Sequence, residues 1–412
     1  MSTPAPQRPD LLTLDDALAR LLGAVRPLGA VDTLSTFDAL GRVLGADVAS
    51  GLDVPPADNT AMDGYAVRCA DVAVAGTVLP VSQRIPAGIV GAALAPGSAA
   101  RIFTGAQVPA GADAVVMQEH CEVVGDSVRI NSVPAAGQWV RRRGEDVRRG
   151  AVVLAAGIRL TPQALGLAAA VGAATLAVAR RPRVALFSTG DELAMPGETL
   201  KPGAIYNSNR FTLRGLIHAL GGDCIDLGIV PDRLDATRAA LRDAASRSEL
   251  IVTCGGVSVG DEDHLRPAVQ AEGRIDLWQI AIKPGKPLAF GDVRRADGTS
   301  AYFIGLPGNP VSAFVTFVLA VRPVLLRLQG ASDLAPRPIE QRADFDWPRP
   351  DRRREFLRVR RTPGGGLALF PNQSSGVLTS TVWADGLVDN PPGQVIRPGD
   401  TVRYLSLAEL LQ

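Results

Sequence analysis

Three apolar runs in the stretch 251–313 each break off into a polar turn that is rich in glycine and proline. Apolar strands followed by glycine loops and helices are how α/β proteins hold anions, because backbone N–H groups and a helix N-terminus meet at the end of the strand. The pattern therefore predicts a sheet whose carboxyl edge binds a ligand. The runs are 251–254, 277–282 and 302–304, and the turns that follow them are 255–263, 283–287 and 305–312.

Lysine is placed in an unusual way. The chain has 43 basic residues, but the only lysines are Lys201, Lys283 and Lys286. Two of them therefore fall in the single turn 283–287, in a chain that otherwise uses arginine. A compact ammonium and a guanidinium fork bind ligands differently, so the pair predicts a site for an anionic, phosphorylated ligand. The alternatives are chance placement and a solvent-exposed basic turn.

Charge and composition exclude several classes of protein. The 43 basic and 42 acidic residues leave a net charge of +1, which argues against nucleic-acid binding. Four cysteines and three histidines are scattered, without the spacing of a zinc site or a disulfide framework. Residues 1–9 lack the apolar run of a leader, and no apolar run reaches the length of a membrane span. We expect a cytoplasmic protein that contacts neither nucleic acid nor membrane.

At 412 residues the chain is long enough for two to four domains. Helical spacing predicts helices over 14–28, with Thr13 as N-cap, and over 37–44 and 161–171. Between 54 and 147 the chain consists of short apolar runs separated by Gly, Pro and Asp, which predicts strands. We therefore expect a split helical domain, 11–53 and 148–180, into which a β-rich domain, 54–147, is inserted.

Residues 181–330 alternate strands with helices and predict a doubly wound α/β domain. Helices are expected over 207–220 and 234–247, and Asn309 and Pro310 begin the last one. The final segment, 336–412, has short apolar runs separated by turns, which predicts a small β-sandwich or barrel. Its expected strands are 355–359, 367–370, 394–396 and 400–405.

The loop 255–263 has the composition of an anion or metal site. Its glycines let backbone N–H groups approach an anion, and Ser258 adds a hydroxyl donor. Asp261 and Asp263 are placed either to hold a divalent cation or to cap the next helix. No Ser-His-Asp arrangement and no P-loop is present. The residues alone therefore predict a strand-end site for an anionic ligand and leave the reaction open.

Taken in order, these motifs resemble the molybdopterin molybdenumtransferase family, which includes the E domain of gephyrin. The similarity covers 58–67, 101–105, 144–147, 188–193, 255–263, the lysine turn and 306–313. It implies an elongated homodimer, each subunit having a split helical layer, an inserted β-rich domain, a molybdopterin-binding α/β domain and a C-terminal β-barrel. It also implies the last step of molybdenum cofactor synthesis, in which molybdate is inserted into adenylylated molybdopterin with release of AMP and with Mg²⁺ as cofactor.

The resemblance assigns roles to individual residues. It implies catalytic roles for Asp58, Thr104, Asp146, Glu192, Asp232 and Asp263. The first three belong to the β-rich region and its hinge, which in the family faces the cleft of the other subunit. The acids that would face a metal are Asp191, Glu192, Asp232, Asp261 and Asp263. The residues that would bind molybdopterin or molybdate are Gly190, Asp191, Ser208, Asn209, Gly255, Gly256, Ser258, Gly260, Lys283, Lys286, Pro307, Gly308, Asn309, Pro310, Ser312, Arg358 and Ser375.

One position departs from the family. Some members carry a further lysine four residues before the first lysine of the turn, and here that position is Gln279.

Three alternatives stay open: a relative that shares the α/β domain, such as the adenylyltransferase that makes the precursor; a non-catalytic scaffold; and a paralogue that prefers tungstate. The expected partners are the upstream adenylyltransferase and the molybdoenzymes that receive the cofactor.

Overall fold

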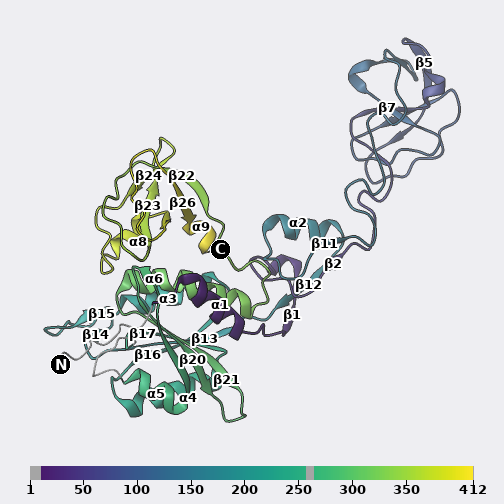
Figure 1. Cartoon of the computed structure of the whole chain (residues 1–412). Helices are drawn as coiled ribbons and strands as arrows, with labels where there is room; N and C mark the ends of the chain where they lie inside the picture. Colours follow the sequence, from purple (N-terminus) through teal and green to yellow (C-terminus); the bar gives the residue numbers. More distant parts are fainter. Residues whose placement is uncertain (1–10, 257–263, 412) are drawn as a thin grey trace, which may run out of the picture.

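The computed structural model describes residues 11–256 and 264–411 of the chain. The molecule is elongated, with the α/β domain and the C-terminal β domain side by side and the inserted β-rich domain at the far end (Figure 1). A small domain formed by the two flanking segments connects these parts. The multidomain architecture expected from the sequence is therefore confirmed.

The α/β domain is built on a six-stranded sheet. Four adjacent strands, β16, β13, β17 and β21, run parallel, and β20 is antiparallel to both of its neighbours. The edge strand β18 consequently points the same way as the parallel four, so five carboxyl ends meet at one edge. The strands in sheet order are β16 (Asp223–Val230), β13 (Arg183–Thr189), β17 (Leu250–Cys254), β21 (Ser300–Leu306), β20 (Pro287–Arg294) and β18 (Gly273–Gln279).

Helices cover both faces of this sheet. The helices α3 (Ser208–Ala219), α6 (Pro310–Thr316) and α7 (Arg322–Leu328) pack with one face, and α4 (Leu234–Arg247) and α5 (Leu265–Glu272) pack with the other. A π-helical turn (Phe317–Val321) joins α6 to α7. The resulting helix Pro310–Leu328 is the one helix of the described residues long and apolar enough to span a membrane, and 94% of its apolar 18-residue window is buried in the protein. It is a core helix here.

The N-terminal helices only partly match the expectation. Helix α1 (Leu14–Ala24) begins at the predicted cap, where the Thr13 hydroxyl accepts from the Asp16 N–H, and α2 (Pro162–Ala170) is also confirmed. The helix expected over 37–44 is wrong, because the chain makes one 3₁₀ turn, η1 (Thr36–Asp38), and then turns at Gly41 with φ +72°. Beyond that turn Leu44 N–H bonds across to the carbonyl of Ile158, as in a ribbon.

Two short ribbons complete this small connecting domain. They are β1 (Val31–Ser35) with β12 (Thr175–Ala179), and β2 (Val48–Ala49) with β11 (Val152–Leu154). Helix α2 packs against them, whereas α1 packs into the core of the α/β domain. The apolar face of α1 is therefore buried in the α/β domain, whereas the strands that follow α1 in the sequence form the connecting domain.

The inserted domain is β-rich, as predicted. Its six-stranded sheet has the order β7-β4-β6-β5-β9-β8, and buried side chains from those strands fill two small cores. The strands are β4 (Gly64–Val67), β5 (Thr77–Ile85), β6 (Ala99–Ile102), β7 (Ala114–Met117), β8 (Cys121–Val124) and β9 (Ser127–Ile130). A further ribbon, β3 (Asn59–Thr60) with β10 (Val140–Arg141), lies where the chain enters and leaves, and the short turns η2 (Cys69–Asp71) and η3 (Gln118–His120) flank the strands.

The C-terminal domain is a closed barrel of five strands, because β23 pairs with both β24 and β25. The strand expected over 394–396 is wrong, since only Ile396 makes a bridge, to Trp347. Two strands, β22 and β25, were not predicted. The elements are β22 (Ile339–Ala343), β23 (Arg354–Arg361), β24 (Gly366–Leu369), α8 (Thr379–Trp383), β25 (Gly386–Asn390), β26 (Thr401–Ser406) and α9 (Leu407–Leu410).

The lysine turn joins the two C-terminal domains. The run 277–282 is not one strand: β18 ends at Gln279, and β19 (Ile282–Lys283) pairs in parallel with β23 of the barrel. Lys283 stands opposite Glu355 in that register. Six buried residues of the C-terminal domain also belong to the same apolar core as helices α1 and α7, so the barrel is packed against the α/β domain along this seam.

Candidate functional site

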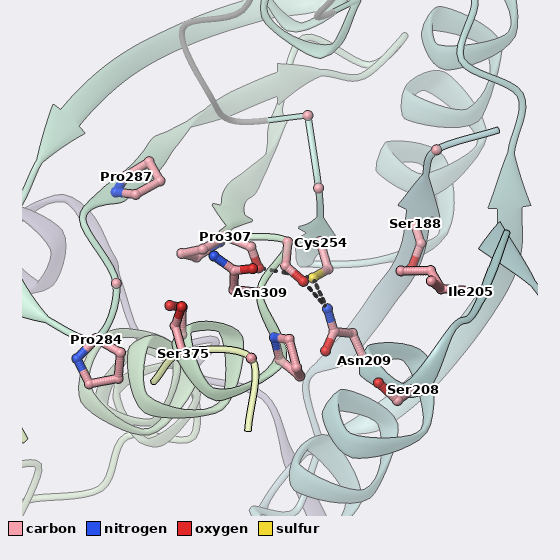
Figure 2. Close-up of a pocket in the computed structure, with 18 of the residues that line it drawn as sticks. Ser188, Ile205, Ser208, Asn209, Cys254, Pro284, Pro287, Pro307, Asn309 and Ser375 are labelled. Atoms are coloured by element: carbon pink, nitrogen blue, oxygen red, sulfur yellow. Dashed lines mark hydrogen bonds between the residues drawn. The ribbon is translucent and has the colours of Figure 1, made fainter. Parts of the chain in front are cut away.

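A cavity of about 970 Å³ lies at the carboxyl edge of the α/β sheet. It is lined by the ends of β13, β17 and β21, the start of α3, the lysine turn and the barrel loop 373–376. Figure 2 shows these segments around the cavity. Ligands of open α/β sheets bind at this edge.

Most residues singled out in the sequence meet at this cavity. Those that line it are Gly190, Glu192, Ser208, Asn209, Asp232, Gly255, Gly256, Lys283, Lys286, Pro307, Gly308, Asn309, Pro310, Ser312 and Ser375. Asp191 and Arg358 are not among the lining residues. Ser258, Gly260, Asp261 and Asp263 lie outside the described residues. The site therefore gathers turns that are up to about 190 residues apart in the chain.

Two glycines are required by the geometry of these turns. Gly255 has φ +96°, and a Cβ at this position would lie 2.9 Å from the carbonyl oxygen of Thr189. Gly285 also has φ +96°, and its Cβ would lie 2.6 Å from Thr316 Oγ1. A larger residue would be strained at either position, so both turns depend on glycine to approach their neighbours.

Asn209 and Cys254 tie three of these turns together. Asn209 Nδ2 donates to the carbonyl oxygen of Gly308 at 2.7 Å and to Cys254 Sγ at 2.9 Å. Cys254 Sγ in turn donates to the carbonyl oxygen of Pro307 at 3.2 Å. Burial raises the pKa of the Cys254 thiol to about 12, so the sulfur stays protonated and can donate while it accepts. The end of β17 is thereby fixed to the starts of α3 and α6.

Helix α6 points its N-terminus at the cavity. Asn309 stands at the N-cap and Pro310 at the first helical position, as predicted, but the Asn309 side chain makes no capping hydrogen bond. The Val311 N–H instead donates to the carbonyl oxygen of Ser375, 2.9 Å away in the barrel loop. The barrel therefore supplies one acceptor for the free N–H groups of this helix end.

Arg358 lies behind that loop. The residue is only 1% exposed, and its guanidinium donates to the carbonyl oxygens of Ser374 at 3.3 Å and Phe356 at 3.2 Å. Burial lowers the pKa of Arg358 to about 10. Its backbone also exchanges two hydrogen bonds with the Gln373 side chain. The described contacts make Arg358 a support of the loop 373–376, so any effect on a ligand passes through that loop.

The two lysines of the turn have different surroundings. Lys283 Nζ lies 3.1 Å from Glu355 Oε1 and 3.6 Å from Asp351 Oδ2. Glu355 is fully buried and Asp351 is partly buried. Arg353 and then Lys283 hold the pKa of Asp351 far below its usual range. No hydrogen bond or ion pair of Lys286 Nζ occurs in the described part of the chain, and Lys286 is exposed. Lys286 is thus the ammonium that is free to meet an anion.

The three residues predicted from the β-rich region do not reach this cavity in the same chain. Asp58 accepts from the Arg143 N–H and from the Arg142 guanidinium, which lower its pKa. Thr104 donates twice to Asp63 Oδ1, at 2.7 Å each. Asp146 donates its backbone N–H to the carbonyl oxygen of Val54. All belong to the domain at the far end of the molecule (Figure 1).

Carboxylates at the cavity offer hard oxygen ligands. Glu192 and Asp232 line it, and Asp191 Oδ1 accepts the Asp232 N–H at 3.4 Å. No group of three or more His, Cys, Asp or Glu that could hold a metal ion occurs among residues 11–256 and 264–411. Mg²⁺ often binds through one or two carboxylates plus substrate phosphates, so the described donor set fits a metal that arrives with a phosphorylated ligand.

Several lining residues were not predicted from the sequence. They are Ser188, Thr189, Asn207, Cys254, Arg353, Gln373, Ser374 and Gly376. Ser188 and Cys254 end buried strands at the edge where ligands bind, so their positions carried a usable signal. In the loop 373–376 the family resemblance pointed to Ser375 alone, and no local pattern marked its neighbours, because the loop reaches the site only through packing of the barrel on the α/β domain.

Three family models match the chain. They are described as "MoeA N-terminal region (domain I and II)" over residues 12–172, "Probable molybdopterin binding domain" over 185–327 and "MoeA C-terminal region (domain IV)" over 340–407. The matched segments correspond to the connecting and inserted domains, the α/β domain and the barrel. The matches to all three regions therefore exclude the alternative that this chain shares only the α/β domain with the family.

Individual relatives agree with these models. A molybdopterin molybdenumtransferase of Haemophilus influenzae is 41% identical over 321 residues, which cover 78% of each chain. One of Synechococcus elongatus is 35% identical over 414 residues, covering 96% of this chain and all of that one. The crystal structure of the molybdopterin biosynthesis moeA protein from Pyrococcus horikoshii superposes with a TM-score of 0.84 at 28% identity, covering 96% and 100% of the two chains. The chain thus belongs to the molybdopterin molybdenumtransferase family, whose members are transferases of molybdenum cofactor biosynthesis.

Proposed function

We propose that this enzyme inserts molybdate into adenylylated molybdopterin, releasing AMP and leaving the molybdenum cofactor. The observation that carries the proposal is the cavity itself, which is large enough for a two-ring phosphorylated ligand and has polar groups of several turns on its walls. Both substrates are anions. The free ammonium of Lys286 and the N-terminus of the helix 310–328 are the positive groups that would attract them.

The chain's own residues would divide the work by position. The lysine turn and the start of α6 would seat the anionic groups, and preorganised donors of this kind stabilise charge as it develops during bond cleavage. Glu192 and Asp232, together with the predicted acids Asp261 and Asp263, would hold Mg²⁺. The metal would supply charge neutralisation at the pyrophosphate that is cleaved.

The first experiment is a turnover assay with purified protein, adenylylated molybdopterin, MgCl₂ and molybdate, with tungstate run in parallel. Release of AMP that depends on molybdate, with formation of active cofactor, is the expected result. Tight binding without turnover would instead indicate a scaffold, and faster turnover with tungstate would indicate a tungstate-preferring paralogue. Repeating the assay in excess EDTA, with Mn²⁺ or Mg²⁺ added back, tests the metal requirement.

We further propose that the enzyme is a cytoplasmic homodimer in which Asp58, Thr104 and Asp146 complete the cavity of the other subunit. The position of these residues, on a domain remote from the cavity of their own chain, supports this arrangement (Figure 1). The upstream adenylyltransferase and the recipient molybdoenzymes are the partners that this reaction would need.

A complementation assay tests the shared site. The variants Asp58→Asn and Glu192→Gln are each expected to be inactive. A refolded or co-expressed mixture should recover about a quarter of wild-type activity, because half of the dimers are mixed and each mixed dimer has one intact site. A mixture that stays inactive, although light scattering shows dimers, would contradict the shared site.

A further inference from the structure

Two polar atoms on the β13–α3 side of the cavity are buried and have no hydrogen-bond partner within residues 11–256 and 264–411. They are Ser188 Oγ, at the end of β13, and Asn207 Nδ2, at the start of α3. The two residues are 1% and 2% exposed, and both line the cavity. Buried polar groups are nearly always satisfied by protein, water or ligand. This wall is therefore suited to the edge of a ligand that offers complementary groups.

Asn209, on the same wall, has a fixed orientation. Both of its amide hydrogens are engaged, one by the carbonyl oxygen of Gly308 and one by the sulfur of Cys254. The amide cannot be reversed, because Oδ1 would then face the Gly308 oxygen. Oδ1 has no partner among the described residues. Figure 2 shows Nδ2 directed at the Cys254 side and the carbonyl oxygen on the other side of the amide. The residue therefore presents an acceptor and no donor.

An apolar surface adjoins these polar atoms. Leu193, Ile205 and Tyr206 line the cavity, and Ile205 and Tyr206 are 56% and 45% exposed. The Tyr206 hydroxyl donates to the carbonyl oxygen of Glu198 at 2.9 Å, which orients the ring. Apolar surface beside a few placed polar groups is typical of sites for flat ring systems.

The cationic groups lie on the opposite wall. Figure 2 shows Ser188, Ile205 and Asn209 on one side, and Pro284 and Pro287 of the lysine turn on the other. A ligand with a ring at one end and an anionic group at the other would thus be bound in one direction only.

We propose that the β13–α3 wall is the heterocycle subsite, in which Asn209 Oδ1 accepts a hydrogen bond from an exocyclic amino group of the ligand. Ser188 Oγ and Asn207 Nδ2 serve the neighbouring ring atoms. Cys254 is a positioning residue, since its thiol holds the Asn209 amide in place. The inference rests on the proposed function, whose substrate carries two aminated heterocycles, a pterin and an adenine.

Matched ligand pairs test the subsite without turnover. IMP differs from AMP, and lumazine from pterin, by an oxo group in place of the exocyclic amino group. Isothermal titration of the full-length protein with all four compounds should show about tenfold weaker binding of the oxo compound in one pair, the loss expected for one hydrogen bond. The pair that discriminates identifies which ring occupies the subsite.

Variants connect this preference to the two residues. Asn209→Leu has a side chain of similar size and should abolish the preference for the amino compound over the oxo compound. If thermal unfolding shows that this variant is not folded, Asn209→Ala is used in its place. Cys254→Ser keeps a donor and an acceptor and should retain the preference. Cys254→Val removes both and should reduce the preference about threefold or more.

Two results would overturn the inference: equal binding of both members of both pairs by the wild-type protein, or a preference that survives in the Asn209 variants. Failure of the proposed function is seen separately, as absence of molybdate-dependent AMP release. A protein that distinguishes AMP from IMP but does not turn over would keep the subsite and lose the proposed reaction. A protein that releases AMP in a molybdate-dependent way but distinguishes neither pair would keep the proposed reaction and lose the subsite.

Discussion

The buried carboxylate of Glu355 should control the junction between the barrel and the α/β domain. Glu355 is 0% exposed. Its Oε1 accepts from Lys283 Nζ at 3.1 Å, and its Oε2 accepts from Trp347 Nε1 at 2.7 Å and from the Asp351 N–H at 3.1 Å. Lys283 belongs to the cavity turn and the other two belong to the barrel side. One side chain therefore links the ligand site to the barrel.

The substitution Glu355→Gln keeps the shape and removes the charge. The glutamine NH₂ must face either the Lys283 ammonium or the donors at Oε2, so at least one hydrogen bond becomes a contact between two donors. Hydrogen bonds to charged groups contribute about 1.5–3 kcal/mol each. Lys283 is partly solvated and stays hydrated when its partner is lost, which reduces the penalty. We expect a loss of about 2–4 kcal/mol of unfolding free energy, mostly at the barrel junction.

Urea unfolding, with hydrogen exchange at 282–287 and in β23, measures this loss. The matched control is Asp243→Asn, which removes a half-exposed ion pair with Arg247 on α4 and should change stability by less than about 0.5 kcal/mol. If Glu355→Gln is as stable as the control, with unchanged exchange in the lysine turn, the buried carboxylate does not fix the junction and the reasoning is refuted.

Three further predictions follow from the site and its surroundings. Lys286→Ala should weaken binding of AMP at least about tenfold and reduce the salt dependence of binding, without lowering the free energy of unfolding. Lys283→Ala should lower both the affinity for AMP and the free energy of unfolding. Equal effects of the two variants in titration and in urea unfolding would contradict these different roles. Gly255→Ala should lower the free energy of unfolding by about 1–3 kcal/mol, because Gly255 has a positive φ and lies near the Thr189 oxygen. Its control is Gly166→Ala within α2, where nothing lies within 4 Å of the added Cβ. This variant should leave the free energy of unfolding unchanged or raise it by up to about 1 kcal/mol. Burial raises the pKa of Cys254 to about 12. The contribution of its neutral thiol to the free energy of unfolding should therefore be fully present below pH 9 and be lost as the pH rises towards 12. In Cys254→Ser the free energy of unfolding should fall less steeply with pH over this range.

Local patterns predicted the α/β domain well because its elements carry their own signals. The helix from 207 to 220 has its cap in Asn207 and its stop in Gly221, and the helix 234–247 has the predicted bounds. The strand ends at 189, 254 and 306 carry the polar turns that form the cavity. The place of these strand ends at one edge of the sheet was therefore predictable from the same residues.

Other elements depend on contacts that no local pattern encodes. The segment 37–44 has helical apolar spacing, but Gly41 and the cross-chain bond of Leu44 impose a turn and a ribbon. Strand β25 (Gly386–Asn390) is fully buried and includes the polar pair Asp389 and Asn390, so it lacks the alternation of an exposed strand. Asp389 is tolerated there because Arg354 binds both of its oxygens, at 2.6 and 2.7 Å.

The scarcity of lysine pointed to a turn that lines the cavity, but the surroundings of the two lysines differ. At 283 a point charge is required by the protein itself. Trp347 and the Asp351 N–H already occupy Glu355 Oε2, so a guanidinium fork, which binds both oxygens of a carboxylate, would have to displace them. An ammonium needs only Oε1. At 286 the ammonium is exposed at the cavity and has no hydrogen-bond or ion-pair partner among the described residues, so it is available to an anion there.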